Sequence, residues 1–152
     1  MDEILFRRAT RADLPAIVRL LADDALGAGR EDAGEPTNRA YVAAFEAMDR
    51  DPNQFLLVAD AQGTVAGCMQ ITYIPGLSRK GMWRGQIESV RVARERRGDG
   101  LGRRMFEFAI AECRRRGCGL VQLTTDAARK DAQGFYDALG FRPSHVGMKL
   151  AL

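Results

Sequence analysis

A glycine-rich loop flanked by arginines is the part of this sequence best suited to chemistry. It contains Arg97, Gly98, Asp99, Gly100, Leu101, Gly102 and Arg103, with a strand-like run before it and an amphipathic helical pattern after it. Glycine adopts positive φ and leaves room for an approaching ligand. The first turn of a helix attracts anions through its free N–H groups and its dipole. The loop therefore predicts a phosphate cradle, and the alternative is a strand–helix connection that merely tolerates glycine.

The spacing of these glycines excludes two common nucleotide-binding patterns. A G-x-G-x-x-G fingerprint would need a third glycine where Arg103 or Met105 stands, and no Gly-Lys-Ser/Thr sequence of a Walker loop occurs. The pattern that fits is R-x-x-G-x-G, from Arg97 to Gly102. The identity of the phosphate ligand has to come from the rest of the chain.

Length and composition predict a single soluble domain over residues 1–152. Hydrophobic residues make up 46% and charged residues 28%, no apolar run reaches about 18 residues, and no secretory signal pattern begins the chain. Cys68, Cys113 and Cys118 give an odd count without a C-x-x-C pair, which favours reduced thiols in a cytoplasm. The single His145 cannot support a histidine-based metal site. We therefore expect a cytoplasmic protein with no metal and no membrane contact.

Charge is unevenly distributed along the chain. Residues 1–76 hold 7 Lys or Arg against 12 Asp or Glu, whereas residues 77–152 hold 16 against 8. One interpretation is a solvated surface with chance asymmetry. The other is a basic half that binds a polyanionic cofactor and an acidic half that faces a cationic acceptor.

Hydrophobic periodicity predicts a mixed sheet between helices. A helix begins between Thr10 and Asp13, residues 55–59 form a strand buried on both faces, and residues 64–73 alternate with period two after a hairpin turn. Further strands are expected at 4–7, 82–92, 119–125 and 145–150, and further helices around 41–48, 101–116 and 131–139. This order, β-α-α-β-β-β-α-β-α-β, indicates a mixed sheet with helices on both faces.

These elements and motifs resemble the GNAT superfamily of N-acetyltransferases over nearly the whole chain. Residues 87–92 are similar to the family's fourth strand, Arg97 to Gly102 to its pyrophosphate loop, and residues 120–125 to its fifth strand. Residues 132–141 match the signature A-x-x-x-Y-x-x-L-G-F. The resemblance implies an α/β (α+β) acyl-CoA N-acyltransferase fold with a six- to seven-stranded sheet, and acetyl-CoA as cosubstrate.

The resemblance also implies where acetyl-CoA binds. The pantetheine arm would lie between splayed fourth and fifth strands and pair with the backbone of Val90 and Val92, beside a β-bulge. Amides from Gly98 to Arg103 would hold the pyrophosphate. The expected cofactor-binding residues are Val90, Arg91, Val92, Arg97, Gly98, Asp99, Gly100, Leu101, Gly102, Arg103, Thr125 and Arg129.

Two of these residues depart from the family pattern. Arg129 stands where many members carry an asparagine at the cofactor's edge. Asp99 places a carboxylate inside a phosphate loop, so its side chain is expected to point away from the ligand.

Transfer of an acetyl group from a thioester to an amine needs a base, a polarised carbonyl and an acid for the thiolate. Tyr136, within the signature, is the candidate acid, and the alternative is an aromatic residue packed on the sheet. Glu88 is the candidate base, acting through water, because a carboxylate on a central strand is costly unless it is used or paired. The alternative for Glu88 is a salt bridge to an arginine. Gln86 could instead hold a water or the acceptor.

Six further residues have side chains capable of chemistry. Cys68, Cys113 and Cys118 are interpreted as small core residues and not as acyl carriers. Trp83 and Tyr73 flank the loop at residues 75–81, where they line either an acceptor pocket or the core. We interpret His145 as a strand residue.

The resulting hypothesis is an acetyl-CoA-dependent N-acetyltransferase acting on a primary amine of a small molecule, by direct attack in a ternary complex. One alternative is an acyl-CoA sensor that binds without transfer. Another alternative is a nucleic-acid-binding module. The placement of the arginines argues against it, because they lie at the two ends of one helix and not along one face. The family resemblance further implies a homodimer.

Overall fold

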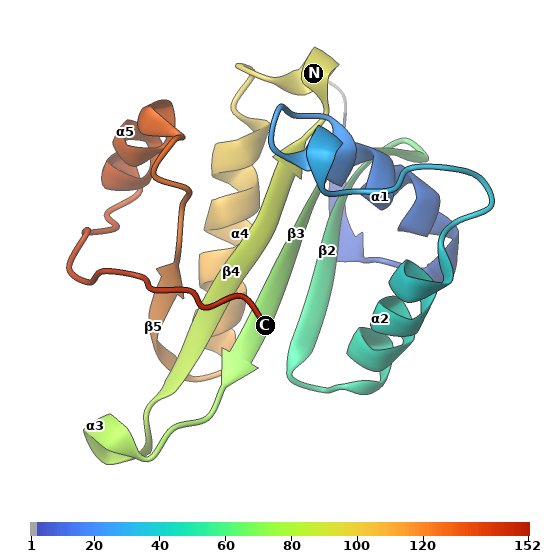
Figure 1. The fold of residues 1–152 in the computed structure, drawn as a ribbon. Helices are drawn as coiled ribbons and strands as arrows, with labels where there is room; N and C mark the ends of the chain where they lie inside the picture. The colour runs from blue at the N-terminus through green and yellow to red at the C-terminus, as the bar shows by residue number, and fades with distance from the viewer. Residues whose placement is uncertain (1–2) are drawn as a thin grey trace.

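A five-stranded sheet divides the molecule into two helical layers (Figure 1). The computed structural model describes residues 3–152, and of Lys130 only the backbone. The strands lie in the order of the sequence: β1 (Ile4–Arg8), β2 (Gln54–Ala61), β3 (Thr64–Ile74), β4 (Trp83–Val92) and β5 (Cys118–Leu123). Neighbouring strands are antiparallel except β4 and β5, which are parallel.

The helices cover both faces of this sheet, as the sequence pattern predicts. The longer helices are α1 (Leu14–Ala22), α2 (Arg39–Arg50), α4 (Leu101–Arg115) and α5 (Lys130–Ala138). Short turns of helix occur at η1 (Arg11–Asp13), η2 (Gly27–Gly29), α3 (Ser78–Gly81) and η3 (Arg94–Arg96). Side chains of α1 and α2 form one core with the sheet, and α4 and α5 pack on the other face.

The core is densest where β2 crosses the middle of the sheet. Leu57, Val58 and Ala59 are fully buried, because each successive side chain meets a helical layer on its own side. Phe106 of α4 is also fully buried. Phe108 is only partly buried and stacks on Phe6 at 5.3 Å.

The start of η1, the turn that leads into α1, is fixed by a short acidic side chain. The carboxylate of Asp13 accepts the backbone N–H of Thr10 at 2.7 Å, as a capping box requires. The guanidinium of Arg7 donates two hydrogen bonds to the same carboxylate, at 2.8 and 2.9 Å. These contacts tie α1 to β1 at the edge of the sheet.

The sheet is smaller than the six to seven strands that the resemblance implied, because the strand predicted at residues 145–150 does not form within this chain. Residues 142–152 are extended but belong to no strand. Alternation of apolar residues indicates a segment able to form a strand, but a strand also needs a neighbour to pair with. Among residues 3–152, nothing pairs with this segment.

Candidate active site

The candidate site is a slot that opens where β4 and β5 part. The two strands pair from Trp83 and Cys118 to Ile87 and Leu123. Beyond Ile87, β4 continues to Val92, but β5 ends and the chain turns away toward α5. The β5-facing edge of the last five residues of β4 is therefore free of strand pairing within residues 3–152. This is the splay that the family resemblance implied.

A β-bulge lies at the point where the strands part. Between the pairs Cys68–Arg91 and Gln70–Glu88, β4 holds one more residue than β3. Ser89 takes up the extra residue in a left-handed conformation, with φ of +55°. The bulge reverses the alternation of the strand, so Val90 and Val92 pack toward α4 whereas Arg91 points to the α1 side, where it pairs with Asp24.

Beyond the slot, the chain forms the glycine loop and enters α4. Gly98 and Gly100 have φ of +85° and +87°, which side chains other than glycine rarely adopt. Gly100 is the N-cap of this 15-residue helix, so the first amides of α4 have no partner inside the helix. The loop and the helix start thus have the conformation that an anion cradle needs.

Asp99, in the middle of this loop, turns its carboxylate to its own chain. Its Oδ1 lies 3.4 Å from the backbone nitrogen of Leu101, and its Oδ2 lies 3.8 Å from Arg96. The carboxylate thus rests near the amides that a phosphate would approach. A bound phosphate would have to move this side chain aside.

An acidic residue that the sequence reasoning missed lies at the centre of the site. Asp24, just after α1, pairs with Arg91 of β4 at 3.2 Å and with Arg129 at the start of α5 at 2.9 Å. Burial raises the pKa of Asp24, but hydrogen bonds from Gly27 and Arg129 and the charge of Arg91 outweigh it, so the pKa falls to about 2. Asp24 therefore stays ionised and links both walls of the slot.

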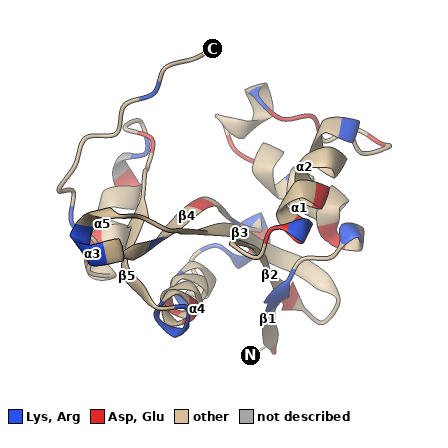
Figure 2. Ribbon diagram, turned by 90° about the horizontal axis from the view of Figure 1, so that it is seen from below, with Lys and Arg blue, Asp and Glu red and all other residues tan. Residues whose placement is uncertain are grey.

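The neighbouring Asp23 holds the glycine-loop arginines in the same way. It pairs with Arg94 at 2.8 Å and with Arg97 at 3.5 Å. The acidic first half of the chain thus neutralises arginines of the basic second half. Part of the charge asymmetry seen in the sequence therefore stabilises the contact between the two halves. Acidic and basic residues alternate along many parts of the ribbon (Figure 2).

Two carbonyls expected to bind the pantetheine arm are occupied by arginine side chains. Arg91 donates to the carbonyl of Val90 at 2.9 Å, and Arg97 donates to the carbonyl of Val92 at 3.1 Å. These hydrogen bonds satisfy two acceptors at the end of β4. A ligand pairing with that edge would have to exchange them for its own.

Tyr136 projects from α5 into the aromatic cluster that closes the far wall of the slot. Its ring packs edge-to-face on Phe106 at 5.6 Å, Phe135 at 5.4 Å and Phe141 at 6.0 Å. Burial raises the pKa of its phenol, although the charges of Arg129 and Arg91 oppose this. The packing role and the acid role proposed from sequence are therefore compatible, because the ring is held by contacts that leave its hydroxyl protonated.

Glu88 lies next to the bulge, at the position where the strands part. Its side chain is exposed and has no ion pair or hydrogen bond within residues 3–152, so the alternative salt bridge is not formed. Gln86, two residues earlier, accepts a hydrogen bond at 2.9 Å from Gln122 of β5. The only carboxylate of β4 is therefore available for chemistry, whereas Gln86 is engaged in holding the strands together.

The remaining candidates from the sequence lie elsewhere. Burial raises the pKa of both Cys68 and Cys113 to about 12, which fits their interpretation as core residues. Tyr73 is buried as well. His145 is exposed in the C-terminal segment and not in a strand. Thr125 is exposed just beyond the end of β5.

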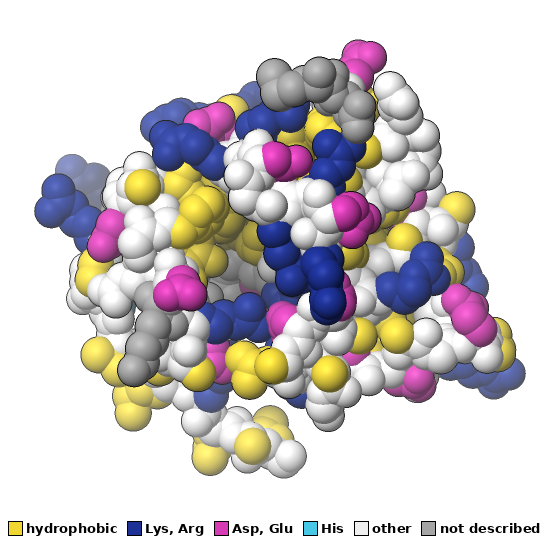
Figure 3. All heavy atoms as spheres, turned by 90° about the horizontal axis from the view of Figure 1, so that it is seen from above, with side chains coloured by type: hydrophobic (Ala, Val, Ile, Leu, Met, Phe, Trp, Pro, Cys, Tyr) yellow, Lys and Arg dark blue, Asp and Glu magenta, His cyan; other side chains and the backbone are white. Residues whose placement is uncertain are grey.

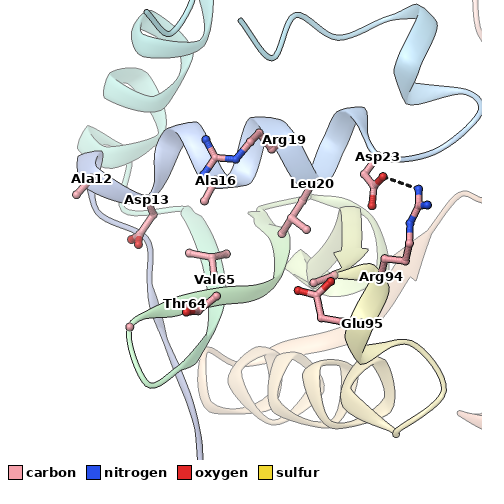
Figure 4. Close-up of a pocket in the computed structure, with 12 residues that line it drawn as sticks. Ala12, Asp13, Ala16, Arg19, Leu20, Asp23, Thr64, Val65, Arg94 and Glu95 are labelled. Carbon is pink, nitrogen blue, oxygen red and sulfur yellow. Dashed lines mark hydrogen bonds and ion pairs between the residues drawn. The ribbon is translucent and has the colours of Figure 1, made fainter. Parts of the chain in front are cut away.

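Two depressions mark the surface of the molecule. Seen from above, a hollow has hydrophobic side chains on its wall and Lys or Arg side chains beside it (Figure 3). A second cavity of about 520 Å³ lies between α1, the β2–β3 turn and η3, where Asp23 pairs with Arg94 (Figure 4). None of the predicted site residues lines the second cavity. No helix among residues 3–152 is long and apolar enough to cross a membrane.

Comparison with known proteins finds one family across most of the chain. The sequence model of the acetyltransferase (GNAT) family matches residues 15–141. The chain is 30% identical to aminoalkylphosphonate N-acetyltransferase of Salmonella typhimurium, over 75% of this chain and 73% of that protein. It is 33% identical to mycothiol acetyltransferase of Pseudarthrobacter chlorophenolicus over 80% of this chain, but this match spans only 38% of the relative's length.

A solved structure matches almost the entire fold. The crystal structure of a protein described as a transcriptional regulator from Bacillus halodurans C-125 superposes with a TM-score of 0.96 at 42% identity. The match covers 99% of this chain and 100% of the other.

Proposed function

Because the chain belongs to the GNAT family and is an acetyl-CoA-dependent N-acetyltransferase, we propose that it acetylates a primary amine of a small molecule by direct attack within a ternary complex. The observation that carries this proposal is the slot between β4 and β5, which leads into the glycine loop. A thioester carried on a long arm can lie along the free edge of β4, with its diphosphate at the start of α4. The amine then approaches from the side of Glu88.

The residues around the slot suit the cofactor in charge as well as in shape. Arg91, Arg97 and Arg129 all reach its rim, and each is paired with Asp23 or Asp24. Arginine binds phosphate oxygens with two parallel hydrogen bonds. We propose that these arginines exchange part of their contact with the aspartates for contact with the diphosphate.

Tyr136 is proposed as the general acid. At neutral pH its phenol is protonated, since burial raises its pKa above the ordinary value. A positioned phenol can donate its proton to the departing thiolate sulfur. The positive charges of Arg91 and Arg129 would stabilise the phenolate left behind.

Glu88 is proposed as the general base. An amine must lose a proton to attack a thioester, and a carboxylate reached through one water can accept it. Glu88 suits this role because it is exposed and unpaired beside the bulge. Backbone amides at the bulge would polarise the thioester carbonyl in the same step.

The named relatives support a small-molecule acceptor, and a panel of amines tests it directly. The Salmonella typhimurium relative is named for aminoalkylphosphonates, so these compounds open the panel. Amino sugars, simple alkylamines and a lysine-containing peptide complete it. Release of free CoA thiol is measured for each acceptor, and calorimetry measures acetyl-CoA binding separately.

Two substitutions connect turnover with the site. We expect Tyr136→Phe and Glu88→Gln each to lower kcat by about 10²- to 10⁴-fold, the usual contribution of a general acid or base. Binding of acetyl-CoA should change little in either variant. Glu46→Gln is the matched control, because it makes the same chemical change on an exposed part of α2.

Three outcomes contradict parts of this proposal. Binding without turnover for every acceptor would indicate a sensor instead of an enzyme with a small-molecule acceptor. Turnover of the peptide alone would exclude the small-molecule class. An unchanged kcat in Glu88→Gln would remove Glu88 from the mechanism.

A further inference from the structure

The cavity beside α1 lies apart from the slot and has the size of a small-molecule site. Its volume is about 520 Å³, and pockets that bind small molecules span about 300–1,000 Å³. Three segments form its walls: η1 with α1, the turn between β2 and β3, and the chain at η3 (Figure 4). Neither Tyr136 nor Glu88 lines it, so a ligand bound there would not touch the proposed acid or base.

The floor of this cavity is apolar. Ala16 and Leu20 lie one turn apart on the same face of α1. Figure 4 shows Leu20 of α1 and Val65 of β3 pointing into the space between the two elements. Leu20 and Val65 are only partly buried, although both pack on the core below α1. The small side chain of Ala16 leaves room beside them for a short apolar group of a ligand.

Two opposite charges stand side by side on the wall formed by η3. Arg94 and Glu95 are consecutive residues, and both line the cavity. The side chain of Arg94 is 74% exposed and donates one hydrogen bond to Asp23 at 2.8 Å, so its guanidinium keeps donors for another partner. Glu95 is exposed and forms no hydrogen bond or ion pair within residues 3–152. The wall therefore offers one cation and one anion to a ligand.

The neighbouring charges leave this pair as the recognition element. Asp13 also lines the cavity, but its carboxylate accepts two hydrogen bonds from Arg7. A ligand with only a negative charge would be repelled by Glu95, and one with only a positive charge would be repelled by Arg94. A ligand that carries both charges a few bonds apart complements the two adjacent side chains.

We propose that this cavity binds a zwitterionic α-amino acid with an apolar side chain, such as leucine. Its carboxylate accepts hydrogen bonds from Arg94, and its ammonium group donates to Glu95. Its side chain lies on the floor formed by Ala16, Leu20 and Val65. No covalent step is involved, and the site is separate from the one at which acetyl transfer is proposed.

One carboxylate connects the cavity with the glycine loop. Asp23 pairs with Arg94 at 2.8 Å and with Arg97 at 3.5 Å, and Arg97 also donates to the carbonyl of Val92. A ligand carboxylate on Arg94 leaves Asp23 to Arg97 alone and so holds Arg97 away from the diphosphate. The amino acid therefore weakens acetyl-CoA binding, and acetyl-CoA weakens binding of the amino acid by the same factor. This coupling rests on the proposed function, whereas the binding site does not.

Titration of three probes in the absence of acetyl-CoA tests the site. L-Leucine carries both charges, isocaproate lacks its ammonium group, and isoamylamine lacks its carboxylate. We expect leucine to bind and each analogue to bind at least about 10-fold more weakly, the loss expected for one charge-assisted hydrogen bond. Calorimetry and NMR spectra of the Leu20 and Val65 methyl groups follow the titration. No binding of leucine up to about 10 mM, where a Kd of about 1 mM would saturate the site, would overturn the proposal, as would equal binding of either analogue.

A matched pair of substitutions locates the bound leucine. Glu95→Gln removes the anion of the cavity and should weaken leucine binding at least about 10-fold. Glu88→Gln makes the same change in the slot and should leave leucine binding unchanged. The reverse result would place leucine in the slot as an acceptor and overturn the proposal. Ala16→Leu should fill the floor and prevent binding with an unchanged circular dichroism spectrum, and undiminished binding to this variant would exclude the cavity.

Titration of acetyl-CoA with and without saturating leucine tests the coupling. The Kd for acetyl-CoA should rise at least about 5-fold when leucine is bound. In Asp23→Asn, which lacks the shared carboxylate, leucine should still bind but should no longer change this Kd. An unchanged Kd in the wild type would refute the coupling. A protein that binds leucine in the cavity but binds no acetyl-CoA would contradict the proposed function and support the cavity site.

Discussion

Gly102→Ala should make the protein more stable and its cofactor binding weaker, which distinguishes a binding glycine from a structural one. Gly102 lies in the first turn of α4 and has no positive φ. A methyl group there would lie 3.7 Å from Cζ of Phe135 and 3.8 Å from Cγ2 of Val92, both ordinary contacts. The substitution therefore meets no clash, and alanine in place of glycine in a helix stabilises it by about 0.5–1 kcal/mol. For a chain of this length, the melting temperature should rise by about 1–4 °C.

The same methyl group points into the gap between the end of β4 and α5. If the diphosphate rests on the first amides of α4, the methyl group displaces it by enough to lose one charge-assisted hydrogen bond. Such a bond contributes about 1.5–3 kcal/mol, which corresponds to a rise of about 10- to 150-fold in the Kd for acetyl-CoA. Scanning calorimetry and titration calorimetry on one preparation give both numbers.

Gly134→Ala is the matched control for this experiment. It makes the same substitution in α5, at an exposed position with nothing within 4 Å of the added methyl group. It should raise the melting temperature by a similar amount without changing the Kd. Unchanged acetyl-CoA binding in Gly102→Ala would show that the diphosphate does not lie at the start of α4, and the assignment of the cradle would have to be abandoned.

Three further substitutions examine the frame around the slot. The Arg7 hydrogen bonds lower the pKa of Asp13 from 3.8 to about 2, so Asp13 adds about 2 kcal/mol of stability that is present above pH 4 and lost as the pH falls toward 2. Asp13→Asn should remove that contribution in urea unfolding at pH 7, and equal stability of the two proteins at pH 7 would contradict this. Gly85→Ala should lower the free energy of unfolding by roughly 1–3 kcal/mol, because the added Cβ would overlap the sulfur of Cys113. Adding Cys113→Ala should recover part of this loss in thermal melts, and no recovery would argue against the clash. Asp24→Asn should lower stability by about 1–3 kcal/mol in urea unfolding at pH 7. Unchanged stability would show that the ion pairs of Asp24 contribute little.

The parts of the fold that could be predicted from sequence are those fixed by local pattern. The buried run at 55–59 and the glycines at 98 and 100 have narrow structural requirements, and the structure confirms β2 and the loop conformation. The missing sixth strand shows the limit of such patterns. Alternation at residues 145–150 describes one face of a strand, but it does not provide a neighbouring strand, and none pairs with this segment among residues 3–152.

The candidate site was predictable where a motif carried it. Tyr136 and the loop from Arg97 to Gly102 were predicted as site residues because they match two motifs of the family that the chain resembles. Asp24 could not be found in this way, because its importance comes from Arg91 and Arg129, which lie 67 and 105 residues later. The only sequence signal was the excess of acidic residues in the first half of the chain, which names no particular residue.

The arginine contacts along β4 have a consequence for handling the protein. A bare strand edge invites pairing with another molecule and is a common start of aggregation. In the slot, Arg91 and Arg97 occupy the carbonyls of Val90 and Val92 that a foreign strand would need. The slot can thus stay open for its own ligand while its β4 edge remains a poor template for a foreign strand, so cosubstrate should not be required to protect that edge in concentrated samples.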